Sequence, residues 1–306
     1  MRAVVTGGAG FIGSNLVDAL LARDDEVHVV DDLSKGKREN VADGARLHVA
    51  DVREPDAAFD EARPDVVFHL AAQADVRVSV ERPDHDAAVN VLGTVRVLEA
   101  ARRHGARVVF ASTGGAIYGE CEGPAPEDAP RRPLAPYGAS KLCGEEYLAT
   151  WNRLYGTSHV ALRFGNVYGP RQEPHGEAGV VAIFMGLLQA GGTPKIYGDG
   201  RQTRDYVFVG DVVDAVLRAA AHEGGGVFNV GTGVETSIRE LAETIADLTG
   251  FTGELVWDTS MPNGQPRRML DASRARDRFG FVAKTALRDG LERTIEWYRS
   301  RDRAAA

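Results

Sequence analysis

Two patterns of apolar and polar positions alternate along the first half of the chain. Short continuous apolar runs are typical of strands buried on both faces, and apolar residues spaced three and four apart are typical of helices. Strands are expected at residues 2–6, 26–30, 46–49, 65–70 and 107–111, and helices at 11–22 and 87–103. Repeated strand–helix units of this kind predict an α/β fold, a doubly wound parallel sheet with helices on both faces.

The second half of the chain is less regular. Further elements are expected at 137–155 (helix), 159–164 (strand), 180–189 (helix), 211–220 (helix), 227–230 (strand) and from a capping box at Ser237 to Gly250 (helix). We expect a Rossmann domain over residues 1–165, to which 205–230 returns, and a smaller, interleaved lobe over 166–306. This lobe is expected at the carboxyl ends of the strands, where open α/β sheets bind ligands.

A glycine-rich loop, TGGAGFIG (6–13), joins the first strand to the first helix. Glycines at this spacing let the backbone approach a pyrophosphate, and the helix N-terminus supplies N–H donors and partial positive charge. A glycine-rich turn without a ligand is the simpler alternative, but Asp31 ends the second strand. A carboxylate there accepts hydrogen bonds from the adenosine ribose and repels a 2′-phosphate, which favours NAD over NADP.

Residues after the later strands extend the expected cofactor site. Asp51 is placed to reach the adenine, although a cap or turn role fits its position equally well. His69 is expected to be a hydrogen-bonded core residue, and the small residues that follow it let a flat ring approach the backbone. Asn90 is expected to hold neighbouring backbone in place. The expected cofactor contacts are Gly7, Gly10, Phe11, Ile12, Gly13, Asp31, Asp32, Asp51, Val52, Leu70, Ala71, Ala72 and Asn90.

Candidate chemistry lies in YGASK (137–141) and in ASTGGAIYGE (111–120). Tyr137 and Lys141 are four residues apart and share one helix face. A phenol with a pKa of about 10 is a poor base at neutral pH, but a nearby ammonium group lowers that pKa. The second run places two hydroxyls and two glycines at a strand end. By themselves, the pair is consistent with surface packing and the run with a turn.

Together these motifs resemble the short-chain dehydrogenase/reductase superfamily. Later motifs are similar to its extended branch, the nucleotide-sugar epimerases and dehydratases. They are HLAAQADV (69–76), LRFGNVYGPRQ (162–172) and GDGRQTRDYVFVGDVVDA (198–215). The resemblance implies that Tyr137 takes the proton of the sugar 4-hydroxyl, and that Lys141 binds the nicotinamide ribose and keeps Tyr137 acidic. Both residues then also contact NAD, which carries a hydride from C4 and returns it.

The resemblance also implies the substrate contacts. Thr113, in preference to Ser112, hydrogen-bonds the 4-hydroxyl, with the two glycines forming a bulge around it. Arg204 and Asn166 belong to the diphosphate site. The pair Arg267 and Arg268 is either a further phosphate or sugar contact or a solvated basic turn. The expected substrate contacts are Ser112, Thr113, Asn166, Val180, Lys195, Ile196, Tyr197, Arg204 and Arg268.

Departures from the branch's patterns favour one activity. Its 4,6-dehydratases carry Asp-Glu directly after the catalytic Thr, where this chain has Gly114 and Gly115. A Glu typical of the decarboxylases is missing too, and Asp31 disfavours an NADPH-consuming reductase. This leaves 4-epimerisation of a UDP-hexose (UDP-glucose or UDP-galactose), with UDP-glucuronate and UDP-N-acetylglucosamine 4-epimerases as alternatives. We expect Glu173 near the pocket to repel a uronate. A non-catalytic NAD-binding regulator is disfavoured because Tyr137 and Lys141 are both present.

Composition narrows the setting. The 306 residues are 43% hydrophobic and 26% charged, with a formal net charge of −8, which argues against a nucleic-acid binder. No apolar run approaches the roughly 20 residues of a membrane span, and no secretory signal is visible. Cys121 and Cys143 form neither a disulfide framework nor a zinc motif, so no metal is expected. We expect a cytoplasmic enzyme, and the resemblance implies a homodimer through helices 87–103 and 137–155.

Overall fold

A parallel sheet of seven strands forms the centre of the computed structural model, which describes residues 1–174, 179–189, 191–260 and 266–305. The strand order is β11-β6-β5-β4-β1-β2-β3. The strands are β1 (Arg2–Thr6), β2 (Glu26–Asp31), β3 (Arg46–Val49), β4 (Val66–His69), β5 (Arg107–Thr113), β6 (Val160–Phe164) and β11 (Gly226–Val230). The strand order reverses between β1 and β4, which is where a doubly wound sheet opens a crevice for ligands.

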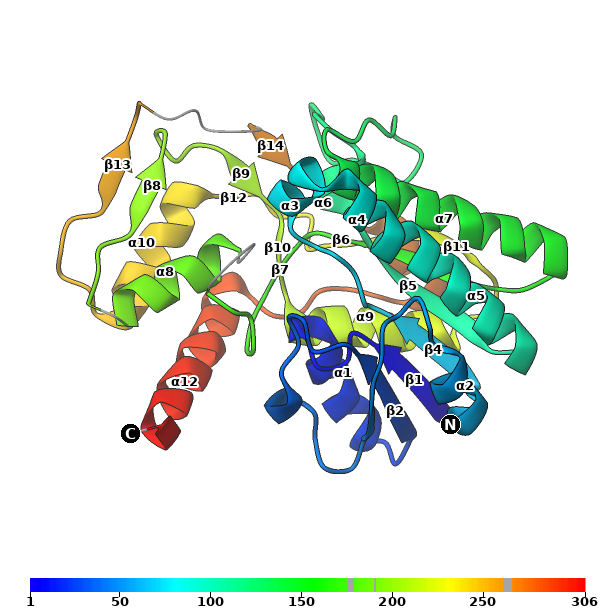
Figure 1. The fold of residues 1–306 in the computed structure, drawn as a ribbon. Coiled ribbons are helices and arrows are strands. Elements are labelled where there is room, and N and C mark those ends of the chain that lie inside the picture. Colours follow the sequence, from blue (N-terminus) through cyan, green and yellow to red (C-terminus); the bar gives the residue numbers. More distant parts are fainter. Residues whose placement is uncertain (175–178, 190, 261–265, 306) are drawn as a thin grey trace.

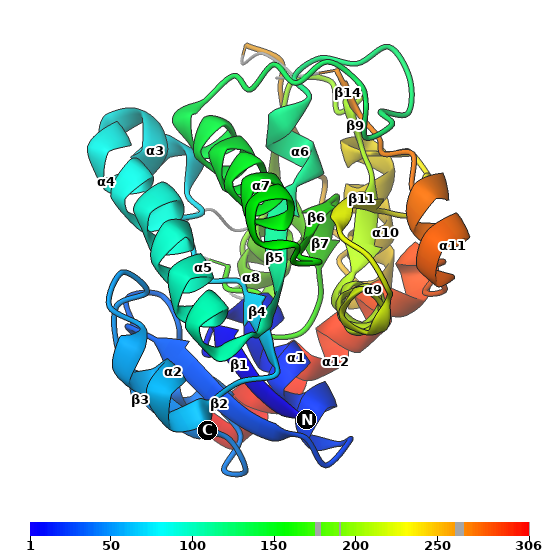
Figure 2. The ribbon, with the colours of Figure 1, turned by 90° about the vertical axis from the view of Figure 1, so that its right-hand side faces the viewer.

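Helices cover both faces of this sheet (Figures 1 and 2). One face packs against α1 (Phe11–Leu21) and α9 (Val209–Ala221), and the other packs against α2 (Asp56–Ala62), α5 (Gly93–His104) and α7 (Pro136–Tyr155). Neighbouring strand residues therefore belong to different cores. Val109 points into the first core and Phe110 into the second. The doubly wound sheet predicted from the apolar pattern is confirmed.

The predicted helix at 87–103 is interrupted in the structure. After α3 (Val76–Glu81), α4 (Pro83–Ala87) runs into a π-helical turn, η2 (Ala88–Leu92), and only then into α5. The Thr94 hydroxyl donates to the carbonyl of Asn90 at 2.6 Å, within this wider turn. Such π-helical turns are often found at functional sites. Here the turn directs the side chain of Asn90 into the protein interior, where it is buried.

The second lobe has a core of its own, which α8 (Val180–Gln189), α10 (Ile238–Thr249) and α12 (Leu287–Ala305) enclose. The Ser237 hydroxyl caps α10 at the amide of Glu240, and the helix ends at Gly250 in a left-handed conformation, as predicted. Short strands form small sheets around this core: β7 (Asn166–Tyr168) with β10 (Tyr206–Phe208), β8 (Lys195–Tyr197) with β13 (Val256–Asp258), and β12 (Thr236–Ser237), β9 (Thr203–Arg204) and β14 (Arg267–Arg268) together. The remaining short helices are η1 (Arg38–Asn40), α6 (Gly114–Ile117) and α11 (Ser273–Phe279).

Candidate active site

The glycine loop lies against the end of β4. Gly7 has a φ of +72°, and a Cβ on it would lie 2.6 Å from the amide nitrogen of Ala71. Gly13 likewise packs on the backbone of Gly7. Two of the predicted cofactor segments, 7–13 and 70–72, are thus side by side, and the loop is a bare backbone cradle at the start of α1. This cradle fits a dinucleotide pyrophosphate.

Asp31 is buried beside this loop. Its carboxylate accepts hydrogen bonds from the amides of Ala9 (3.0 Å) and Leu33 (2.9 Å). Burial raises the pKa of Asp31, and the two backbone hydrogen bonds oppose that rise. A Cβ on Gly36 would lie 2.7 Å from the Asp31 carboxylate, so only a glycine at position 36 leaves that carboxylate open to a ligand. Asp31 therefore stands where an adenosine ribose would accompany a pyrophosphate on the loop.

Other predicted cofactor residues have structural partners. Asp32 is exposed and caps a turn at the amide of Ser34 (2.9 Å). Asp51 accepts from the backbone and the side chain of Arg53, whose charge lowers the pKa of that carboxyl. Val52 is buried below Gly93. The turn interpretation of Asp51 thus matches the contacts that the residue makes.

Two buried polar residues hold the segment after β4. The imidazole of His69 bonds to the hydroxyls of Thr6 (2.7 Å) and Thr94 (3.0 Å), and burial lowers the pKa of His69 to about 3. The amide of Asn90 bonds to both the N–H (2.8 Å) and the C=O (2.9 Å) of Gln73. His69 is a neutral core residue, as expected, and Asn90 fixes the backbone next to the glycine loop.

Lys141 is the buried cation of the site. Its side chain is 3% exposed, and its ammonium group donates to the carbonyl of Ala111 at 2.9 Å, above the ring of Phe110. Burial lowers the pKa of Lys141 to about 8, against the opposing charges of Asp86 and Glu145. Tyr137 lies one turn earlier on the same face of α7 and is half-buried. The helix thus presents both residues at the end of β5.

Thr113 and Ser112 face opposite sides of β5. Ser112 is buried, and its hydroxyl points toward α7, where it donates to Glu145 at 2.5 Å. Thr113 is the last residue of β5 and caps no backbone group of the following helix. Ser112 is therefore engaged by Glu145, whereas Thr113 Oγ1 lies near Gly115 on the side of Arg268. The expected bulge is wrong: β5 pairs with β6 in continuous register up to Thr113, and α6 starts at once because the glycines adopt a helical turn.

The two glycines after Thr113 have different surroundings. A Cβ on Gly114 would lie 2.5 Å from the side chain of Leu270, which packs on it from the second lobe. A Cβ on Gly115 would meet only Thr113 Oγ1 at 3.8 Å and Arg268 Nη1 at 3.9 Å. Gly114 thus admits a neighbouring side chain, whereas Gly115 opens onto the space between a hydroxyl and a guanidinium group.

Two arginines of the second lobe lie next to each other. Arg204 on β9 is in register with Arg268 on β14. Burial, together with the nearby charge of Arg204, lowers the pKa of Arg268 to about 10. Arg267 points elsewhere and pairs with Glu235, at 2.8 Å between Nη2 and Oε2. Two close, largely buried guanidinium groups favour a polyanion such as a diphosphate.

The other predicted substrate residues surround these arginines less closely. Lys195 is exposed and pairs with Asp258 at 2.7 Å, Ile196 is buried, and Tyr197 is exposed. The backbone N–H of Asn166 donates to the carbonyl of Asp205, next to Arg204. Val180 begins α8 and packs against the core of the second lobe.

Glu173 has two cationic partners in the structure. Its carboxylate pairs with Lys37, from the loop after β2, at 2.7 Å and with Arg301 of α12 at 3.4 Å. These two cations lower the pKa of Glu173 and hold it against the loop that follows Asp31. Its charge is therefore partnered and gives no reason to exclude a uronate.

One group of residues in the described part of the chain has metal-ligand chemistry. Ligand atoms of His28, His48 and Glu61 lie within 4.8 Å of one another. The planes of the two imidazoles are nearly parallel, and His28 Nδ1 and His48 Nε2 are 2.9 Å apart. This separation is that of an N–H···N hydrogen bond between the two rings.

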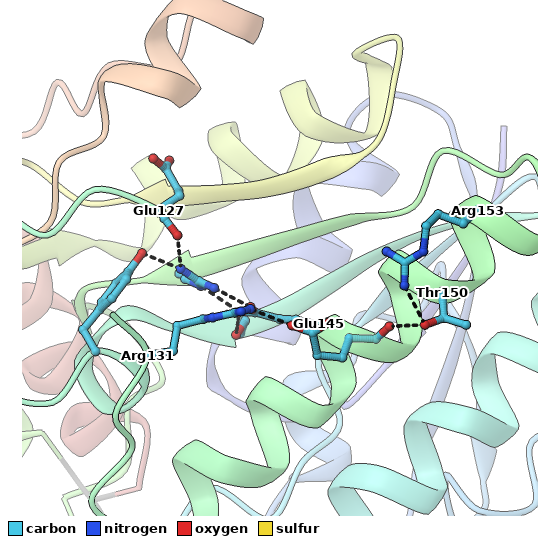
Figure 3. A network of polar contacts seen from close by, with 9 residues as sticks. Glu127, Arg131, Glu145, Thr150 and Arg153 are labelled. Carbon is cyan, nitrogen blue, oxygen red and sulfur yellow. Dashed lines mark hydrogen bonds and ion pairs between the residues drawn. The ribbon is translucent and has the colours of Figure 1, made fainter. Parts of the chain in front are cut away.

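Sequence reasoning missed a buried ion pair behind the site. Arg163 of β6 and Glu145 of α7 form a two-point contact, with 2.9 Å from Nε and 2.6 Å from Nη2. Figure 3 shows the polar network around this pair, with Glu127 and Glu145 labelled. The signals in the sequence were an arginine inside an apolar strand, VALRF, and a glutamate four residues after Lys141.

A doubly wound sheet with a glycine loop after its first strand, and a Tyr–Lys pair on α7 bonded to β5, is typical of a dinucleotide-dependent enzyme of the short-chain dehydrogenase/reductase type. Residues 3–231 match the NAD dependent epimerase/dehydratase family, and the chain belongs to this family. It is thus an enzyme whose cofactor is NAD. The predictions of the family, the fold and the cofactor are confirmed.

Relatives match nearly the whole chain. A UDP-glucose 4-epimerase of Mycolicibacterium smegmatis is 50% identical over 98% of this chain and 99% of its own. The structure of a UDP-glucose 4-epimerase of Thermotoga maritima with UDP-glucose is 42% identical, with a TM-score of 0.95 over 98% and 99% of the two chains. That of a Thermus thermophilus UDP-glucose 4-epimerase with NAD is 44% identical, with a TM-score of 0.91 over the same shares. In the described part of this chain, no helix has the length and apolar character that crossing a membrane requires.

The different surroundings of Gly114 and Gly115 predict different outcomes for the same substitution. Gly114→Ala is expected to lower the free energy of unfolding by about 1–3 kcal/mol, because the new methyl group overpacks Leu270. Gly115→Ala should change it by less than about 1 kcal/mol, because alanine suits a helix and meets only ordinary contacts. It should instead impair sugar turnover. Urea unfolding and turnover measured on both variants test this, and equal stability losses would contradict it.

Proposed function

We propose that the protein inverts C4 of a UDP-hexose and so interconverts UDP-glucose and UDP-galactose. One observation carries the proposal. Gly114 and Gly115 follow Thr113 directly, so no acid or base stands at these two positions, and Lys141, one turn after Tyr137 on α7, bonds to β5 at the carbonyl of Ala111. Such a site has groups for moving a proton and holding a diphosphate. It has none at these positions for the elimination of water.

Each residue has a defined task in this reaction. Tyr137, as phenolate, takes the proton of the 4-hydroxyl, and Thr113 hydrogen-bonds the same oxygen. The buried ammonium of Lys141 favours the phenolate form of Tyr137. When bound, NAD supplies the hydride acceptor and donor for C4. Arg204 and Arg268 hold the diphosphate, and Tyr137 returns its proton once the 4-keto sugar has presented its other face.

UDP-glucose is the substrate that the comparisons favour. Relatives at 42–50% identity bear the name UDP-glucose 4-epimerase. A UDP-N-acetylglucosamine 4-epimerase of Methanobrevibacter ruminantium is 33% identical over 98% of both chains, with a TM-score of 0.93. Because Glu173 is partnered and Arg268 borders the space at Gly115, UDP-glucuronate remains the alternative with an observation in its favour.

Turnover without added reductant tests the proposed function. The purified protein is incubated with UDP-galactose, UDP-N-acetylgalactosamine or UDP-galacturonate, and the products are separated by chromatography. We expect UDP-glucose from the first substrate, at a kcat/KM at least tenfold above those of the other two. Consumption of NADPH, or accumulation of a 4-keto-6-deoxy sugar, would contradict epimerisation. Preference for the uronate would favour the alternative.

Removal of the buried ammonium group should shift the pH dependence. In Lys141→Met the phenol of Tyr137 loses its cationic neighbour, so its pKa rises toward about 10. The acid limb of the kcat profile should move to higher pH, and activity at pH 7 should fall about 10²–10⁴-fold. Profiles recorded with saturating NAD separate this effect from weaker cofactor binding. An unshifted limb would mean that Lys141 does not set the ionisation of Tyr137.

We also propose a homodimer through α5 and α7. These helices lie side by side on one face of the sheet (Figure 2), and α7 exposes Tyr147, Leu154 and Tyr155. Leu154→Arg is expected to convert the protein to monomers in analytical ultracentrifugation, because a charge would enter the apolar contact. Leu134→Arg is the matched control, since Leu134 is equally exposed (68% against 64%) but lies outside both helices. Monomers in the unaltered protein would exclude the dimer.

A further inference from the structure

A chain of buried polar side chains starts directly behind the proposed base. Glu145 lies one helical turn after Lys141 on α7 and is 2% exposed. Its carboxylate accepts hydrogen bonds from the Ser112 hydroxyl at 2.5 Å and from Nε and Nη2 of Arg163. Arg163 is 1% exposed, so the pair is cut off from solvent. Each charge is met by a partner of opposite sign.

Two successive turns of α7 are therefore joined to successive residues of β5. Lys141 donates to the carbonyl of Ala111, and Glu145 accepts from the hydroxyl of Ser112. The next residue of the strand is Thr113. These two contacts set how far Tyr137 lies from Thr113, because one residue stands on the helix and the other on the strand.

The far side of Arg163 leads to the second lobe. Its Nη1 donates to the hydroxyl of Tyr118 at 2.7 Å, and that hydroxyl donates to Asn229 Oδ1 at 2.7 Å. Asn229, at 0% exposure, donates from its amide to the carbonyls of Ala125 (2.9 Å) and Asp271 (3.0 Å). Asp271 lies three residues after Arg268 in the segment that packs on Gly114.

Ala125 and Glu127 close this end of the network. The backbone of Ala125 bonds to Met269 and to Asp271, on either side of Leu270. Glu127 accepts from the backbone amide of Asn229 at 2.8 Å, and its carbonyl accepts from Arg163 at 3.0 Å. One connected set of hydrogen bonds thus reaches from the helix of the proposed base to the segment of Arg268. Figure 3 shows the part of it around Glu145 and Glu127.

We propose that Glu145 and Asn229 are positioning residues for the reaction: Glu145 aligns the Tyr137 helix with the Thr113 strand, and Asn229 sets the Arg268 segment against the same frame. The inference rests on the proposed function. A buried ion pair adds little net stability compared with apolar residues of the same shape, but a fully hydrogen-bonded network selects one geometry. Hydride and proton transfer depend on such geometry to within about half an ångström.

Glu145→Gln is the first test. Gln keeps the shape but removes the charge, and kcat is expected to fall about tenfold or more while the KM for the UDP-sugar changes less than about threefold. Lys141 also loses a carboxylate that favours its charged form. The pH above which activity declines should therefore move to a lower value. A purely structural role would lower the melting temperature and leave this pH unchanged.

A second variant keeps the test decisive if Glu145→Gln fails to fold. Glu145→Gln with Arg163→Met removes both charges, so no unpaired charge stays buried. It should fold and show the same loss of kcat. Ser112→Ala should have a lower kcat than the parent. Ser112→Thr, which keeps the hydroxyl, should have a kcat close to that of the parent. If the folded double variant retains kcat within twofold of the parent, Glu145 has no positioning role.

Asn229→Leu probes the other end with a different readout. Loss of the bonds to Ala125 and Asp271 should raise the Kd for UDP, measured by calorimetry, at least fivefold and leave the pH profile of kcat unchanged. Asn152 bonds to His159 outside the network, so Asn152→Leu is the matched control and should keep the parent's UDP affinity. Equal effects of both variants would overturn the role of Asn229. A parent protein that binds UDP but turns over no UDP-sugar would refute the proposed function instead, while the UDP affinities would still test Asn229.

Discussion

The structure of the site depends on the buried ammonium group of Lys141. An isolated charge inside a protein is costly, so this one is held on the carbonyl of Ala111 and over the ring of Phe110. Burial brings its pKa down to about 8, which leaves the group mostly charged at neutral pH. The contact with Ala111 joins the helix of the proposed base to the strand of the proposed hydroxyl donor.

The second lobe contributes positive charge where the first contributes bare backbone. Arg204 and Arg268 lie in register on adjacent short strands, and their mutual repulsion and burial disfavour both charges at once. A diphosphate between them would relieve that repulsion. The glycine loop offers amide donors without side chains to the other pyrophosphate. Each lobe thus carries groups that suit a diphosphate.

Contacts between distant segments explain several differences between the sequence predictions and the structure. The helix expected at 87–103 contains a π-turn at Asn90, whose side chain bonds to a loop remote in sequence. Thr113 was preferred to Ser112 only through a resemblance, and the pleat of β5 turns the Ser112 hydroxyl toward Glu145 and leaves that of Thr113 at the strand end. Arg267 and Arg268 separated for the same reason, since neighbours on a strand point in opposite directions. Glu173 pairs with Lys37, which stands in the loop after β2, and the sequence pattern gave no sign of this partner.

By itself, the sequence determined the alternating strands and helices that build the large sheet, the glycine loop with its acidic residue, and the spacing of Tyr137 and Lys141. These features are local: an apolar period, a turn that needs glycine, and a helical repeat of 3.6 residues specify them within a few residues. Only the tertiary structure decided which hydroxyl reaches the site, what the two glycines admit, and how Glu145, Arg163 and Asn229 connect the lobes. Those outcomes depend on contacts between segments that are distant in the sequence, and no local pattern specifies which residues such contacts join.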